Sequence, residues 1–158
     1  MRYLVESGEV EVDGRDHDGW TPLTWAASKG RLDVVRYLVA TGKVDVEARD
    51  KNQMTPLQIA ARDNRLPVVE FLIREAGADA GATDYQGRNA LCCVVERAEA
   101  ESGIKGIVLA LLATGKCDPR VVDERGHSAL SLAQERLEED HGKWPEVLRS
   151  LESFVQGA

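Results

Sequence analysis

The chain has 158 residues, 43% of them hydrophobic, and its 20 Lys and Arg against 27 Asp and Glu give a net charge of −7. No segment carries the basic run that tracks nucleic-acid phosphates, so we expect no nucleic-acid partner. The longest apolar run, residues 107–113, is too short to cross a bilayer and the N-terminus does not read as a signal peptide, which predicts an intracellular protein, cytoplasmic or nuclear, without a membrane partner.

The chain repeats itself from its first residues. Arg-Tyr-Leu-Val at residues 2–5 returns at residues 36–39, and Thr-Pro-Leu at residues 21–23 returns at residues 55–57. A fixed period of this length indicates stacked repeat units. Because the N-terminal segment matches the second half of the next unit, we expect a partial repeat at 1–15. Its uncovered apolar edge would be available for self-association or for a preceding repeat.

Each of the next two units predicts a pair of helices. Thr21 and Thr55 can cap the first helix of their units, and a proline follows at the first helical position, where its missing N–H costs nothing. Apolar residues at helical spacing predict the second helices at 32–41 and 66–75. The glycines that follow these helices suit left-handed C-caps, and they are Gly42 and Gly77.

The same frame continues more weakly toward the C-terminus. Asn89 stands 34 residues after Thr55, and an insertion of about five residues follows around 99–103. Ser128 begins a fifth unit whose helix after Pro145 has the polar outer positions of a terminal cap. We therefore predict a single domain with a partial repeat at 1–15, repeats at about 16–48, 49–82 and 83–121, and a degenerate capping repeat at 122–158.

The Thr-Pro-Leu-x-x-Ala-Ala core at this period resembles the ankyrin repeat. The resemblance implies an all-α solenoid of stacked helix-turn-helix units, joined by short β-hairpin fingers with Asp, Asn and Gly at their tips. The finger segments are residues 10–20, 44–54, 78–88 and 117–127. Their usual spacing, 13 residues from glycine to helix start, also resembles ankyrin arrays common in filamentous fungi.

The histidine of the family's Thr-Pro-Leu-His pattern is absent, and the residues in its place are Thr24, Gln58, Cys92 and Ser131. We expect the polar contact between repeats to be weaker for this reason. The fourth and fifth units also lose the proline, so their local stability should be lower.

The resemblance also implies a concave binding surface made of finger tips and the residue before each first helix. Trp, Tyr, Met and Arg, which are enriched at interface cores, recur there. The implied contact residues are His17, Asp18, Trp20, Lys51, Asn52, Met54, Tyr85, Gln86, Arg88, Glu124, Arg125 and His127. The alternative for Trp20 and Met54 is packing within their own fingers. Trp25 occupies an inward position, which predicts core packing, with a place in a groove as the alternative.

Catalytic motifs are not evident. Cys92 or Cys93 with His127 would make a nucleophile and a base, but nothing in the pattern would lower the cysteine pKa. The three cysteines and three histidines lack the spacing of a disulfide framework or metal site, so we expect no metal and no cofactor.

The pattern therefore predicts a non-catalytic module that binds another protein through its concave face. Two alternatives stay open. The first is a small-molecule biosynthetic enzyme with a groove around four residues, Trp20, Trp25, Tyr85 and His127. The second is a structural spacer within a larger signalling protein.

Overall fold

The computed structural model describes residues 12–97, 103–139 and 144–157. The predicted partial repeat and its uncovered edge lie almost entirely outside the described residues, as does most of the predicted insertion at 99–103. Within the described ranges the chain forms helices, and their bounds are α2 Pro22–Ser28, α3 Leu32–Ala40, α4 Pro56–Arg62, α5 Leu66–Arg74, α6 Ala90–Arg97, α7 Ile104–Leu112, α8 Ala129–Glu139 and α9 Trp144–Gly157.

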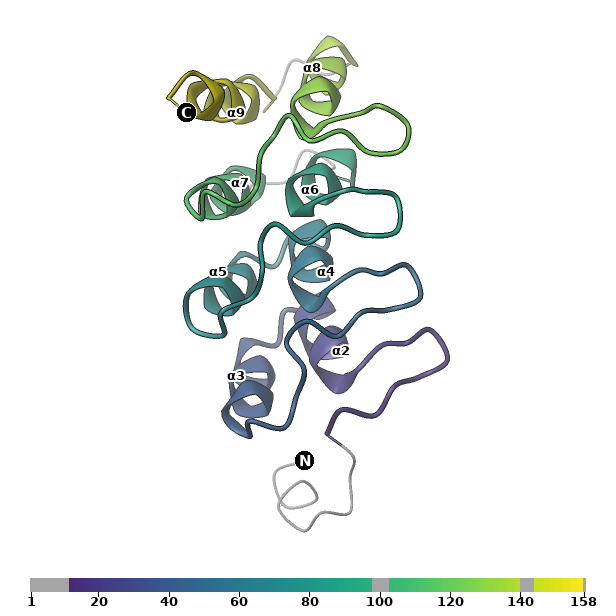
Figure 1. The fold of residues 1–158 in the computed structure, drawn as a ribbon. Coiled ribbons are helices and arrows are strands. Elements are labelled where there is room, and N and C mark those ends of the chain that lie inside the picture. The colour runs from purple at the N-terminus through teal and green to yellow at the C-terminus, as the bar shows by residue number, and fades with distance from the viewer. Residues whose placement is uncertain (1–11, 98–102, 140–143, 158) are drawn as a thin grey trace.

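The helices stack in two rows (Figure 1). The first helices of the units, α2, α4, α6 and α8, form one row, and the second helices, α3, α5, α7 and α9, form the other. Each first helix also packs on the second helix of its own unit. The loops before the first helices project beyond their row. This is the all-α solenoid of stacked helix pairs that the sequence predicts.

The predicted helix starts are confirmed. The Thr21 side chain accepts a hydrogen bond from the backbone N–H of Thr24, and Thr55 forms a capping box with Gln58. Prolines follow both caps, so the first turn has one backbone N–H fewer that needs an acceptor. The later units are capped as well, since Asn89 Oδ1 accepts from the Cys92 N–H at 3.1 Å and Ser128 Oγ accepts from Ser131 at 3.1 Å.

The predicted helix ends are close to those found. Both second helices end one residue earlier than predicted, at Ala40 and Arg74. Gly42 and Gly77 adopt the left-handed conformation expected of a C-cap, with φ of +65° and +71°. Gly115 repeats this geometry after α7, with φ of +67°.

Gln58 keeps a strong polar contact between repeats. Its amide nitrogen donates to the carbonyls of Ala82 at 3.2 Å and Arg88 at 2.9 Å, both in the joint that leads to the next unit. The expectation of a weakened contact is therefore wrong at this position, because the longer amide side chain reaches the carbonyls of the following finger. Gln58 is buried, so these bonds are shielded from water.

The fingers contain no β-strand in the described ranges, which corrects the prediction of β-hairpin fingers. One isolated antiparallel bridge joins Val122 and Ser128. Each finger is instead a tight turn, and neighbouring fingers are linked by single backbone bonds such as Lys51 N–H to the Asp18 carbonyl and Tyr85 N–H to the Asn52 carbonyl. The reason is that an aspartate side chain binds the N–H groups that would otherwise extend a ladder.

Candidate interaction groove

An aspartate at the base of each finger organises the site. One carboxylate oxygen, Oδ1, accepts hydrogen bonds of 2.8–3.0 Å from the backbone N–H groups two and four residues later. The four aspartates are Asp16, Asp50, Asp84 and Asp123. Each turn thus fixes the residue just before a first helix, and it leaves the second oxygen, Oδ2, available to a side chain.

In the first two fingers the second oxygen binds a tryptophan. Trp25 Nε1 donates to Asp16 Oδ2 at 2.8 Å, and Trp20 Nε1 donates to Asp50 Oδ2 at 3.3 Å. The two ring centroids lie 4.6 Å apart with the planes tilted by 59°. Both indole N–H groups are therefore occupied, so the pair presents only ring surface to a partner.

Trp25 is 46% exposed, whereas the residues at its position in the next two units, Ile59 and Cys93, are 0% and 2% exposed. The expectation that Trp25 packs in the core is wrong. An indole N–H needs an acceptor, which the apolar interior between helices does not supply, and Asp16 supplies it outside. The hydrogen bond from Trp25, followed by the backbone bond from Trp20, lowers the pKa of Asp16.

Met54 lies beneath this surface. It is 3% exposed and forms a small hydrophobic cluster with Ile59 and Cys93, against which the half-buried Trp20 packs. Met54 was predicted as a contact residue with packing as the alternative, and its buried side chain favours the alternative. The reason is that its apolar side chain packs against Ile59 and Cys93, and Arg62 Nη1 lies 3.5 Å from its sulfur.

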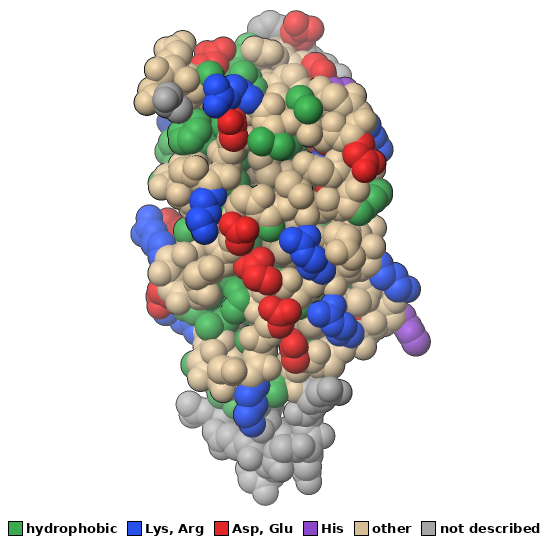
Figure 2. Space-filling view, viewed as in Figure 1, with side chains coloured by type: hydrophobic (Ala, Val, Ile, Leu, Met, Phe, Trp, Pro, Cys, Tyr) green, Lys and Arg blue, Asp and Glu red, His purple; other side chains and the backbone are tan. Residues whose placement is uncertain are grey.

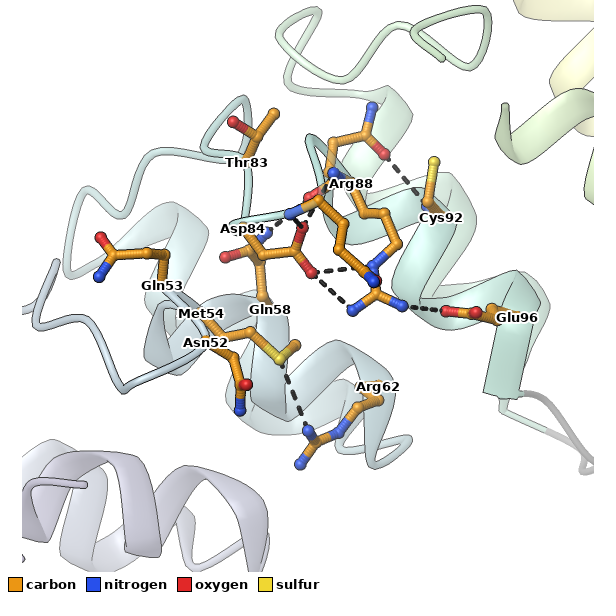
Figure 3. A network of polar contacts seen from close by, with 12 residues as sticks. Asn52, Gln53, Met54, Gln58, Arg62, Thr83, Asp84, Arg88, Cys92 and Glu96 are labelled. Atoms are coloured by element: carbon orange, nitrogen blue, oxygen red, sulfur yellow. Dashed lines mark hydrogen bonds and ion pairs between the residues drawn. The ribbon is translucent and has the colours of Figure 1, made fainter. Parts of the chain in front are cut away.

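A second set of polar contacts continues the site toward the fourth unit (Figure 3). Arg88 Nε and Nη2 donate to Asp84 Oδ2 at 2.9 and 2.7 Å, and Nη1 pairs with Glu96. Burial by itself would lower the pKa of Arg88, but the bonds to Asp84 outweigh it and raise that pKa. The positive charge of Arg88 is thus already matched within the chain.

Arg62, at the end of α4, is less fully engaged. Its Nε donates to Asp63 Oδ1 at 3.0 Å, while Nη1 has only the Met54 sulfur at 3.5 Å. Ser28 Oγ donates to the other oxygen of Asp63 at 2.6 Å. Burial would raise the pKa of Asp63, but the bonds from Arg62 and Ser28 lower it. Because a thioether is a weak acceptor, Nη1 keeps most of its donor capacity.

Two adjoining depressions follow the line between the fingers and the first helices, and together we call them the inner groove. The first, of about 350 Å³, is lined by Asp18, Trp20, Trp25, Asp50, Lys51, Asn52 and Arg62. The second, of about 310 Å³, is lined by Asn52, Met54, Arg62, Tyr85, Arg88, Cys93, Glu96 and Arg97. The two depressions adjoin, because Asn52 and Arg62 line both of them.

The inner groove brings together seven of the twelve predicted contact residues, which are Asp18, Trp20, Lys51, Asn52, Met54, Tyr85 and Arg88. The other five do not line it, and they are His17, Gln86, Glu124, Arg125 and His127. Sequence reasoning missed the charged residues at the ends of first helices, Arg62, Glu96 and Arg97. Their position in the repeat could have identified them, because each lies seven or eight residues after the residue that caps its helix.

The cysteines do not have the chemistry of nucleophiles. Burial raises the pKa of Cys92 to about 11 and that of Cys93 and Cys117 to about 12, so all three are protonated near neutral pH. Among the described residues, no group of three His, Cys, Asp or Glu side chains could hold a metal ion. Nor does that part of the chain contain a helix long and apolar enough to cross a membrane.

A family model described as ankyrin repeats in three copies matches residues 1–84, slightly more than half of the chain. The chain therefore belongs to the ankyrin-repeat family. No curated protein matches the chain in sequence. Ankyrin repeats indicate a protein-protein interaction module, in a family whose members are generally not enzymes.

Proposed function

We propose that the inner groove, on the concave face of the array, is the surface that binds a protein partner, with the predicted repeats acting as one domain. The observation that carries this proposal is Trp25. A large aromatic side chain is held in the open by a hydrogen bond to Asp16 and lies against Trp20, where burial by a partner would remove much apolar surface from water.

The groove suits a protein segment better than a small substrate. The four residues of the enzyme alternative are not gathered, since Trp20 and Trp25 line the first depression, Tyr85 lines the second, and His127 lines neither. The raised cysteine pKa values also argue against a Cys-His pair. The resemblance of the finger spacing to that of fungal ankyrin arrays stays a proposal.

Affinity capture from the source cells with quantitative mass spectrometry tests the proposal. We compare the unaltered chain, Trp25→Ala and a matched control, Leu109→Ala. Leu109 on α7 is 47% exposed, against 46% for Trp25, but it belongs to the row of second helices and does not line the groove. The control therefore removes a similarly exposed apolar side chain from another face.

We expect the main captured protein to be lost with Trp25→Ala and retained with Leu109→Ala. Titration of that protein with the purified variants should show a loss of about 2 kcal/mol of binding free energy, typical of an interface anchor. Capture that is unchanged in Trp25→Ala would remove the groove as the binding surface.

A further inference from the structure

The inner groove has two chemically different ends. At the Trp20–Trp25 end the two indole donors are used up, because each indole N–H binds an aspartate. Lys29 lies over the Trp25 ring, 5.8 Å from its centroid, so a cation already occupies one approach to the aromatic surface. An uncharged apolar side chain is the group that this end favours.

The other end offers donors that lack acceptors. Arg62 Nη1 has only the Met54 sulfur, and Arg97 is exposed with no hydrogen bond or ion pair to any residue in the described ranges. Lys51, which lines the first depression together with the tryptophans, is likewise exposed and unpaired among those residues. A carboxylate is the protein group that best matches such donors.

The acids around these cations are already engaged. Asp50 holds Trp20, Asp63 is bound by Arg62 and Ser28, and Glu96 pairs with Arg88. In the lining this leaves one carboxylate without such a partner, that of Asp18, against the donors of Arg62, Arg97 and Lys51. The groove thus favours an anion locally although the whole chain carries −7.

Figure 2 shows acidic side chains gathered in a column along the connections from the second helices to the fingers. Asp79, on the connection that follows α5, is paired with Lys116 at 3.6 Å, so its charge is matched within the chain.

We propose that the inner groove binds an extended peptide segment in which a large apolar side chain, for Trp20 and Trp25, stands near an acidic side chain, for Arg62 and Arg97. This inference rests on the proposed function and names the chemistry of its partner. Apolar contact supplies affinity, and the carboxylate sets direction and specificity.

Three matched series of synthetic peptides test the inference by fluorescence anisotropy. Each peptide carries one tryptophan or leucine in a neutral background, followed at varied spacing by aspartate in the first series, asparagine in the second and lysine in the third. We expect the aspartate series to bind best, about tenfold more tightly than the asparagine series, and to weaken as salt is added.

Arg62→Gln and Arg97→Gln should each narrow the preference for aspartate over asparagine, while Arg74→Gln should leave it unchanged. Arg74 is a control of the same type, because it is well exposed on α5 and does not line the groove. Arg97→Gln alters an exposed side chain, so it tests the inference even if Arg62→Gln unfolds the chain.

Tight binding of the lysine series, an aspartate preference that survives in both arginine variants, or no binding by any series would overturn the inference. The proposed function is judged separately. If capture of the protein depends on Trp25 but the peptides show no preference for an acid, the groove remains the proposed binding surface and the proposal of an acidic partner segment is rejected. If capture ignores Trp25, the groove itself is wrong.

Discussion

The indole N–H of Trp25 donates a 2.8 Å hydrogen bond to Asp16 Oδ2, which joins the first helix of the second unit to the base of its own finger. The other oxygen of Asp16 binds the backbone N–H groups of Asp18 and Trp20. One carboxylate thus shapes the turn and also holds an exposed aromatic ring in place. Several consequences of this geometry can be measured.

Removing the indole N–H should raise the pKa of Asp16. We expect Trp25→Phe to move that pKa up toward the ordinary value of 3.8, because the bond from Trp25 is the largest cause of the lowering. NMR titration of the aspartate carboxyl measures it. Trp20→Phe is the control, since its backbone N–H still binds Asp16; a rise of equal size there would contradict the assignment.

The same shift has a consequence for stability. A carboxyl whose pKa is lower in the folded state stabilises the fold above its unfolded pKa, and this contribution is lost as pH falls through the folded value. Asp16 and Asp63 are both lowered. We therefore expect the free energy of unfolding to fall less between neutral and acidic pH in Trp25→Phe than in the unaltered chain. Urea unfolding at neutral pH and at about pH 3 measures this difference.

Thiol reactivity should be low in the folded chain. Burial raises the pKa of Cys92 to about 11 and of Cys93 and Cys117 to about 12, and Cys117 also donates to the Ala80 carbonyl. A chromogenic disulfide reagent should react slowly with the native protein and label all three thiols after unfolding. Fast labelling of Cys93 would mean that the groove floor opens.

Gln53 offers a stabilising substitution. Its φ is +59°, while the matching finger positions are glycines, among them Gly87 with φ of +77°. The left-handed conformation costs an ordinary residue about 1–2 kcal/mol, offset partly by the greater chain entropy of glycine when unfolded. We expect Gln53→Gly to raise the free energy of unfolding by about 0.5 to 1 kcal/mol.

The reverse exchange is the matched control. Gly87→Gln should destabilise the chain by a similar amount, because its Cβ would meet no atom closer than 3.8 Å and only the backbone conformation is at issue. Both variants are measured by urea unfolding. If both changes shift stability in the same direction, backbone strain is not the cause.

Gln58→Leu tests the contact between repeats. The substitution leaves the Ala82 carbonyl without its donor and the Thr55 N–H without its acceptor, while the Arg88 carbonyl keeps the bond from the Asp84 N–H. We expect a loss of about 2 to 4 kcal/mol, since each buried unsatisfied group costs about 1–3 kcal/mol. Gln134→Leu, at an exposed position on α8, is the control. Similar unfolding midpoints for the two variants would show that the Gln58 amide contributes little.

Stability along the array should not be uniform. The fourth and fifth units lack the Thr-Pro start, so their amides should exchange with deuterium sooner than those of the units that begin at Thr21 and Thr55. The side-chain caps at Asn89 and Ser128 limit the difference. Equal protection across all units would contradict this prediction.

The predicted features that hold are those decided within a few residues. Thr21 and Thr55 cap their helices, and Gly42 and Gly77 end theirs, because caps depend on the local backbone and on one side chain. The 34-residue period likewise predicts the solenoid, because stacked repeat units need only the same pattern in each unit.

Only part of the candidate site could be predicted from the sequence. Finger position predicted Trp20 and Tyr85 as groove residues. It gave the packing of Met54 only as an alternative, and it did not predict that Arg62 and Arg97 would line the same groove from the ends of two helices. Those placements depend on contacts between neighbouring units, such as Met54 with Cys93, which no single repeat specifies.

By itself the sequence determined the repeat period, the helix pairs, their caps and the family. The tertiary structure alone decided which side chains became surface. Trp25, Ile59 and Cys93 occupy one position in three successive units, yet only Trp25 lies open, because Asp16 on the adjacent finger offers the acceptor that its indole needs. A contact between separate segments exists only after the chain has folded, and so it was the fold that created the inner groove.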